Sequence, residues 1–197
     1  MDPRRFDESY YRRFYLGSGR VHGARDISHL ASGVTGMAAW LGVDVRSVLD
    51  VGAGTGLWGR WFRRHRPSVQ LRSIDVSEYA CEVFGHERRD ISVWRARRSF
   101  DLVIFQSVLQ YMRDADAARA IDHVGRMCRG LLYLEVVTRE DGPNLDLART
   151  DTAIHVRSAA WYRARLSRHF VQVGAGLWAA RRAKVALYAL EAAARSR

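Results

Sequence analysis

Three glycines and two aspartates in this chain are spaced so that together they could bind a small ligand. Asp50 ends a short apolar segment and precedes a turn containing Gly52, Gly54 and Gly56, and Asp75 ends the next apolar segment. Glycine lets a backbone approach a ligand closely and adopt conformations that a β-carbon would obstruct. A carboxylate at Asp50 would attract an ammonium group and repel a phosphate. The Asp75 carboxylate could accept two hydrogen bonds from a vicinal diol such as a ribose.

The spacing of these glycines bears on the class of nucleotide that the turn could hold. They recur at intervals of two and two, whereas the usual dinucleotide fingerprint has intervals of two and three. Asp50 would also lie against the pyrophosphate of a dinucleotide. An NAD-dependent oxidoreductase therefore remains only a less favoured alternative.

The elements that would position these residues alternate between strand-like and helix-like segments. Apolar runs predict strands at 47–51, 71–76, 100–105 and 131–137, and a hairpin formed by 170–173 and 177–180. Apolar residues at intervals of three and four predict helices at 57–65, 77–84, 114–128 and 158–169, with two earlier helices at 2–15 and 25–42. This alternation predicts an α/β fold with a mainly parallel sheet, which binds ligands at the carboxyl ends of its strands.

Three segments of the chain, in this order, resemble the class I S-adenosylmethionine-dependent methyltransferase family. They are Asp-Val-Gly-Ala-Gly-Thr-Gly at 50–56, Ile-Asp-Val-Ser at 74–77 and Phe-Asp-Leu-Val-Ile at 100–104. The resemblance covers residues 45–140. It implies a Rossmann-like, seven-stranded, mostly parallel sheet with an antiparallel C-terminal hairpin strand, helices on both faces and extra N-terminal helices. The implied organisation is an N-terminal helical lid or extension (1–44), a methyltransferase core (45–182) and a C-terminal helix (183–197).

The same resemblance implies roles for individual residues toward S-adenosylmethionine. The glycine turn with Asp50 would hold the methionine portion, and Asp75 would hold the ribose. Asp90 and Ile91 stand where the family often places residues around the adenine, and Gln106 stands where a residue faces the transferred methyl group. An aromatic cluster at 10–15 would fold over the cofactor. The implied cofactor-binding set is Tyr11, Tyr15, Asp50, Gly52, Ala53, Gly54, Gly56, Asp75, Val76, Asp90, Ile91 and Gln106.

Residues that would select the methyl acceptor are fewer. His155, in an irregular segment after the strand at 131–137, is the candidate general base, because imidazole titrates near neutral pH. The alternative is a structural or surface histidine. Tyr111, Trp161 and Tyr162 could line an acceptor pocket, although Trp161 equally fits a residue that packs its helix onto the sheet. The Asn/Asp-Pro-Pro-aromatic signature of adenine and glutamine-amide methyltransferases is replaced by Gln-Ser-Val-Leu at 106–109.

Composition limits the class of protein further. The chain has 197 residues, 48% of them hydrophobic, which suits one domain with a core and excludes a disordered protein. Its formal net charge is +11, and Lys184 is the only lysine, so nearly all of the positive charge is on arginine. This charge is consistent with an anionic partner and equally with a solvated surface. Two cysteines, Cys81 and Cys128, provide no disulfide framework, and no cluster of metal-binding spacing is present.

Taken together, these features predict a methyltransferase that acts on the oxygen or nitrogen of a small-molecule acceptor, with an acidic or phosphorylated acceptor as one explanation of the arginine surplus. The alternative is an RNA methyltransferase or nucleic-acid-binding module, for which arginines at 60–66 and 88–98 would contact phosphates. No secretory signal or membrane-spanning segment is apparent, so a cytoplasmic protein without a membrane partner is expected. The oligomeric state stays open.

Overall fold

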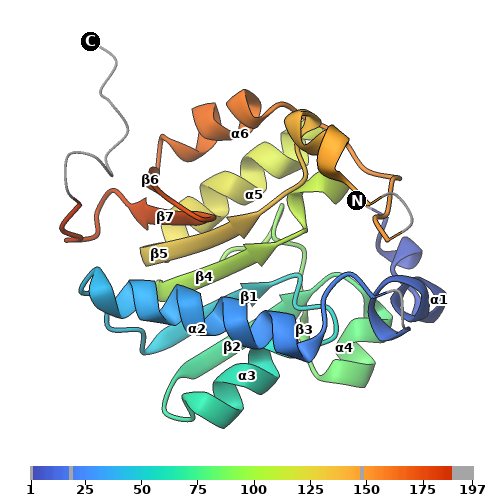
Figure 1. The fold of residues 1–197 in the computed structure, drawn as a ribbon, viewed down its shortest axis with the longest axis horizontal. Helices are drawn as coiled ribbons and strands as arrows, with labels where there is room; N and C mark the ends of the chain where they lie inside the picture. The colour runs from blue at the N-terminus through green and yellow to red at the C-terminus, as the bar shows by residue number, and fades with distance from the viewer. Residues whose placement is uncertain (1, 18–19, 147–148, 188–197) are drawn as a thin grey trace.

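The computed structural model describes residues 2–17, 20–146 and 149–187, which fold around one seven-stranded sheet (Figure 1). The strand order is β3-β2-β1-β4-β5-β7-β6. Neighbouring strands from β3 to β5 are parallel, and β7 runs antiparallel to both β5 and β6. The predicted fold class is therefore confirmed. The strands are β1 (Ser47–Val51), β2 (Gln70–Asp75), β3 (Glu87–Arg88), β4 (Phe100–Gln106), β5 (Cys128–Glu135), β6 (Phe170–Gly174) and β7 (Leu177–Ala180).

Helices cover both faces of the sheet. On one face lie α2 (Ala24–Trp40) and α3 (Leu57–His65), and on the other lie α5 (Asp114–Met127) and α6 (Ala159–Leu166). The helix α4 (Glu78–Phe84) follows β2. The short elements are η1 (Pro3–Arg5), α1 (Glu8–Tyr11), η2 (Arg12–Leu16), η3 (Leu109–Tyr111) and η4 (Arg139–Asn144). None of the helices among the described residues is both long and apolar enough to cross a membrane.

The central strand β4 shows why the sheet needs helices on both sides. All of its residues except the last are buried. Val103 and Phe105 belong to the apolar cluster formed with α5 and α6, whereas Leu102 and Ile104 belong to the cluster formed with α2 and α3. Successive side chains of a strand point to opposite faces, so a continuous apolar run needs cover on both faces.

The predicted N-terminal extension divides into two parts in the structure. The apolar side chains of α2, such as Ile27, Val34 and Ala38, share a cluster with Val48 of β1, so α2 is a layer of the core. Residues 3–16 instead pack against α4. The single helix predicted over 2–15 is wrong, because the Asp7 carboxylate accepts a hydrogen bond from the Tyr10 backbone and begins a new helix there.

The C-terminal helix predicted over 183–197 falls largely outside the described residues, and the described residues 183–187 are not helical. Residues 77–84, 114–128 and 158–169 form helices close to the predicted bounds. Arg113 is the N-cap residue of α5, and Asp114 is the first residue of the helix. The Asp114 carboxylate accepts a hydrogen bond from the Arg157 guanidinium, which brings a distant loop to the start of the helix.

Arg157 is a buried arginine, and its contacts lead to a stability prediction. Its guanidinium donates to the backbone oxygens of Leu109 and Met112 and to the Tyr162 hydroxyl, and the residue is 5% exposed. Arg157→Met leaves those buried acceptors without a donor, so we expect the free energy of unfolding to fall by about 2 kcal/mol. Urea denaturation measures this change. Arg168→Met, at an exposed arginine, is the control and should stay within about 0.5 kcal/mol of the wild type.

Candidate functional site

The glycine turn lies at the carboxyl end of β1 and joins it to α3. Gly52, Gly54 and Gly56 have φ angles of +67°, +53° and +72°, which is the left-handed region that favours glycine. The backbone N–H of Gly52 donates to the carbonyl oxygen of Ile74 at 2.9 Å, and that of Gly54 donates to Oδ2 of Asp75 at 2.9 Å. The turn is therefore held against the end of β2.

Two of these glycines have different surroundings. A β-carbon on Gly52 would lie 2.4 Å from Cγ2 of Val108, so the protein itself requires glycine there. A β-carbon on Gly54 would meet no atom closer than Cε1 of Tyr11 at 3.8 Å. Gly54 faces open space in a cavity that it lines together with Tyr11. A side chain at Gly54 would extend into that cavity.

Asp50 has a buried carboxylate without a complete set of partners. The residue is 2% exposed, and its Oδ2 accepts no hydrogen bond from any described residue. Burial, with a smaller contribution from the Asp75 charge, raises the pKa of Asp50 to about 7. A buried acceptor atom without a partner is costly, so this position suits a ligand that brings a positive charge or a donor.

Asp75 lies across the turn from Asp50. Its Oδ1 accepts a hydrogen bond from the Ser77 N–H at 2.9 Å, and its Oδ2 accepts the one from Gly54. Burial raises the pKa of Asp75, and these backbone hydrogen bonds oppose that effect. The carboxylate is thus fixed in orientation at the end of β2. Each oxygen keeps a second lone pair for a ligand hydroxyl.

The N-terminal aromatic segment covers this edge of the sheet. The Tyr10 hydroxyl donates to the Tyr111 hydroxyl at 2.9 Å, and the ring of Tyr11 stacks on Tyr79 of α4 with 5.6 Å between centroids. Phe6 is anchored by the Ser77 hydroxyl, which donates to its carbonyl oxygen. The segment therefore forms one wall of the cavity beside the glycine turn.

This cavity, which we call the cofactor cavity, is narrow. Its open volume is about 110 Å³. Cavities that hold small molecules and cofactors usually measure roughly 300–1,000 Å³. In this structure the cavity is therefore smaller than those that usually hold a nucleoside. Tyr11 and Tyr15 lie in the N-terminal aromatic segment and line the cavity.

Most of the predicted site residues meet at this cavity although they come from six parts of the chain. The predicted residues that line it are Tyr11, Tyr15, Asp50, Gly52, Ala53, Gly54, Asp75, Val76, Ile91, Gln106 and Tyr111. The carboxyl ends of β1, β2 and β4 bring the central members together, because the three strands are parallel neighbours.

Four predicted residues lie elsewhere. Gly56 begins α3 beside His86 and does not line the cavity. Asp90 uses Oδ1 to accept a hydrogen bond from the Ser92 N–H at 2.8 Å. His155 is exposed and lines neither this cavity nor the adjoining one, so its position does not support the role of general base. Trp161 packs against the core under the guanidinium of Arg165.

A polar network lies at the ends of β4 and β5, and Gln106 is the only one of its members that the sequence predicted as a site residue. Nε1 of Trp58 donates to Oε1 of Gln106 at 2.8 Å, and Nε2 of Gln106 donates to Oε2 of Glu135 at 3.2 Å. The Ser107 hydroxyl donates to Oε1 of Glu135 at 2.7 Å. Glu135 could have been predicted as a site residue, because it is a charged residue near the carboxyl end of the apolar strand predicted at 131–137. His22, which lies 3.5 Å from Glu135, gave no signal in the sequence.

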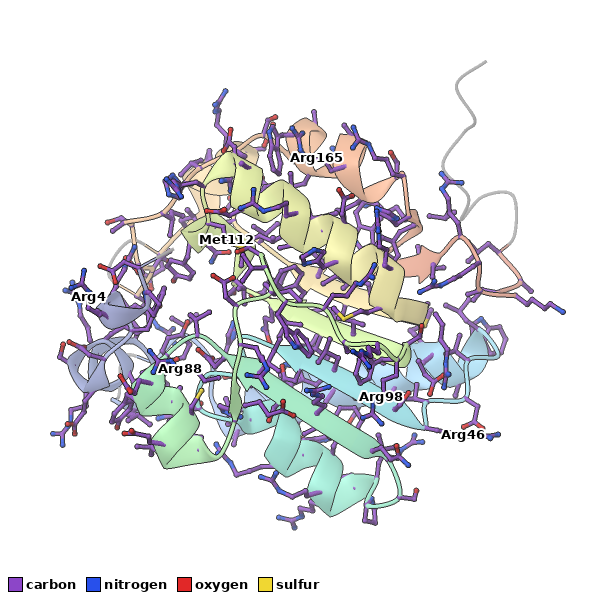
Figure 2. All side chains as sticks on the ribbon, turned by 180° about the vertical axis from the view of Figure 1, so that it is seen from behind. Arg4, Arg46, Arg88, Arg98, Met112 and Arg165 are labelled. Atoms are coloured by element: carbon purple, nitrogen blue, oxygen red, sulfur yellow. The ribbon has the colours of Figure 1, made fainter. Side chains whose placement is uncertain are left out.

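The arginine surplus is distributed over the molecule. Figure 2 shows Arg4, Arg46, Arg88, Arg98 and Arg165 at separate places around the fold. The first three form ion pairs with carboxylates of nearby elements, which offsets part of their charge. A continuous basic stripe would be needed to follow a phosphate backbone. These five arginines give no support to a nucleic-acid partner.

Comparison with solved structures finds the same fold in proteins of low sequence identity. The N-methyltransferase NodS from Bradyrhizobium japonicum, in complex with S-adenosyl-L-homocysteine, is 16% identical with a TM-score of 0.59 over 89% of this chain and 98% of NodS. The plantazolicin methyltransferase BpumL, also with that product, is 12% identical with a TM-score of 0.62 over 83% of this chain and 68% of BpumL. The [4+2]-cyclase SpnF is 18% identical with a TM-score of 0.58 over 82% of this chain, which spans 63% of SpnF.

Sequence comparison gives the family. No curated protein matches the chain in sequence. The sequence profile of the family described as "Methyltransferase domain" matches residues 20–178, which include the glycine turn, both aspartates and the whole of strands β1 to β6. The chain therefore belongs to the methyltransferase-domain family and has the fold of the class I S-adenosylmethionine-dependent methyltransferases.

Proposed function

We propose that this enzyme binds S-adenosylmethionine at the glycine turn and transfers its methyl group to a nitrogen or oxygen atom of a small-molecule acceptor. The observation that carries the proposal is the buried Oδ2 of Asp50, which has no partner among the described residues and lies beside the glycine turn, where Gly54 faces open space. The ammonium group of the cofactor's methionine portion is the kind of partner that this oxygen lacks.

The remaining groups of the cofactor fit the other residues of the cavity. Asp75 offers its free lone pairs to the two ribose hydroxyls, and Val76 and Ile91 offer apolar surface to the adenine ring. Gln106 lines the cofactor cavity and holds its amide between Trp58 and Glu135. When bound, the cofactor supplies an electrophilic methyl group on its sulfonium.

A second cavity adjoins the first, and we propose that it holds the acceptor. Both cavities are lined by Tyr15, His22, Ser107 and Tyr111, so these four side chains lie between them. The open volume of this acceptor cavity is about 660 Å³, within the usual range for small-molecule sites. Its size therefore favours a small acceptor over a polymer.

The charges on the walls of the acceptor cavity bear on the chemistry of the acceptor. Its acidic residues are Glu135, Asp141 and Asp151, of which Asp151 is paired with Arg5, and its one arginine is Arg163. Hydrogen bonds from His22, Ser107 and Gln106 outweigh burial and lower the pKa of Glu135 to about 2, so this carboxylate is ionised at neutral pH. Such walls favour a neutral or cationic acceptor, in place of the acidic or phosphorylated one considered from the arginine surplus.

The proposal has a direct binding test. Isothermal titration calorimetry should show binding of S-adenosylhomocysteine and no binding of NAD, because Asp50 lies where a pyrophosphate would be placed. A protein that bound NAD and not S-adenosylhomocysteine would contradict the proposal.

Methyl transfer itself needs a second experiment, because SpnF shows that this fold is also found in a [4+2]-cyclase. The enzyme is incubated with S-[methyl-³H]adenosylmethionine and a panel of phenols and aliphatic amines, with RNA as a further arm. We expect label in a phenol or an amine and none in RNA. If no member of the panel were labelled, the proposed methyl transfer to a small molecule would be overturned. Label in RNA alone would favour the nucleic-acid alternative.

A further inference from the structure

The boundary between the two cavities carries a histidine that the proposed function has not used. His22 lies between η2 and α2 and lines both cavities. Its Nε2 is 3.5 Å from Oε1 of Glu135, the last residue of β5. Among the described residues that line these cavities, His22 is the only histidine.

Glu135 is held in place by three further donors. Ser107 donates its hydroxyl to Oε1, and Gln106 and Tyr133 donate to Oε2, each at 3.2 Å. Ser107 is also fixed by its own backbone, which has a φ of +54° and donates its N–H to the carbonyl oxygen of Glu135 at 2.8 Å. Because these contacts use most of its lone pairs, Glu135 is suited to orient His22 and not to bind the acceptor directly.

We propose that His22 takes the proton of the acceptor during methyl transfer and that Glu135 positions its ring and stabilises the resulting imidazolium. This inference rests on the proposed function. The carboxylate keeps the ring proton on Nε2, so Nδ1, which no described residue engages by a hydrogen bond, is the basic nitrogen. This pair replaces His155, which is exposed and outside both cavities.

The step balances as an in-line displacement. A lone pair of the acceptor oxygen or nitrogen forms the new bond to the methyl carbon, and the carbon–sulfur bond breaks with its electron pair moving to sulfur. The proton of the acceptor passes to Nδ1 of His22, and the imidazolium later releases it to water. General-base assistance of this kind contributes about 10²–10⁴-fold.

The other ionisable groups of the cavities are less suited to accept this proton. Burial raises the pKa of Tyr111, Tyr10 and Tyr15, so these phenols stay protonated. Asp50 and Asp75 belong to the glycine turn in the cofactor cavity. The charged and titratable groups around His22 are Glu135, Tyr15, Tyr111, Tyr133, Asp50 and Asp75 of the cavities and Arg20, Asp26 and Arg149 near the start of α2.

The first test follows the ring of His22 in the full-length protein without any acceptor. Nitrogen NMR of histidine-labelled protein should show the ring of His22 with its proton on Nε2, and Glu135→Gln should shift the Nε2 and Nδ1 resonances of this ring. The reason is that the variant removes the carboxylate beside Nε2. His29, on the exposed side of α2, serves as the internal reference, and its resonances should not shift. Unchanged His22 resonances in the variant would overturn the pairing.

The second test uses methyl transfer to the acceptor that the labelled panel identifies. We expect His22→Gln to lower kcat about 100-fold or more and to remove the fall of rate at acidic pH, with S-adenosylhomocysteine affinity within threefold of the wild type. His29→Gln should keep the wild-type rate, and thermal melting checks that each variant is folded. Transfer by His22→Gln at the wild-type rate would overturn this inference alone. A wild type that methylates nothing would overturn the proposed function and the inference with it.

Discussion

Asp75→Asn is expected to weaken binding of S-adenosylhomocysteine by about 10- to 100-fold, because a neutral amide replaces charge-assisted hydrogen bonds to the ribose with weaker ones. The carboxylate is already oriented by the N–H groups of Gly54 and Ser77, so it meets the two hydroxyls without reorganisation. Isothermal titration calorimetry measures the change.

The matched control for this variant is another buried aspartate of the same sheet. Asp101 accepts hydrogen bonds from the Ser47 hydroxyl and the Arg129 guanidinium, at the start of β4 and so at the opposite edge from the cofactor cavity. Asp101→Asn should lower stability and leave S-adenosylhomocysteine affinity within twofold of the wild type. If Asp75→Asn also bound with wild-type affinity, the ribose role of Asp75 would be wrong.

Asp50→Asn is expected to stabilise the ligand-free protein at neutral pH and to weaken its binding of S-adenosylhomocysteine. Burial raises the pKa of Asp50 in the folded state to about 7, above the ordinary value of 3.8. The contribution of Asp50 to the free energy of unfolding is therefore largest below pH 3.8, where its carboxyl group is protonated in both states. This contribution falls as the pH rises and is lost once the pH passes about 7, where the folded state also ionises. Above that pH the ionised, unpartnered group costs about 2–4 kcal/mol, which the amide avoids.

The opposite signs of these two effects separate a ligand-binding role from a structural one. Urea denaturation at pH 5 and pH 8 should show a larger gain for Asp50→Asn at pH 8. Calorimetry should show wild-type affinity for S-adenosylhomocysteine rising between pH 6 and pH 8, as Asp50 ionises to meet the ammonium group, with proton release on binding. A variant that lost stability at pH 8 while keeping wild-type affinity would contradict both assignments.

The layout of the core was predictable because its signals are local. The apolar strands at 47–51 and 100–105 and the apolar stripe of 114–128 each follow the period of the element they form. The glycine turn was predictable for the same reason, since its residues are neighbours in the chain. Asp50 and Asp75 line one cavity because they lie at the carboxyl ends of two neighbouring parallel strands, Asp50 as the next-to-last residue of β1 and Asp75 as the last residue of β2.

The predictions that the structure contradicts or does not support lie in segments without periodicity. Nothing in the sequence around His155 indicates which way the irregular loop after β5 turns, and the structure leaves that side chain exposed. The helix predicted over 2–15 missed the break at Asp7, where a capping hydrogen bond competes with helical continuation. Arg157 was not singled out at all, although it joins that same loop to the start of α5.

The sequence by itself therefore determined the class of fold and named most residues of the proposed cofactor site, because those depend on periodic patterns and on one contiguous turn. Only the tertiary structure identified the cavity proposed for the acceptor and the side chains that line it. The register of β4 and β5 sets Gln106 beside Glu135, and the packing of α2 on the sheet brings His22, more than a hundred residues earlier in the chain, to the same carboxylate. Such contacts arise from which strands become neighbours and how a helix packs on them, and no local spacing encodes either.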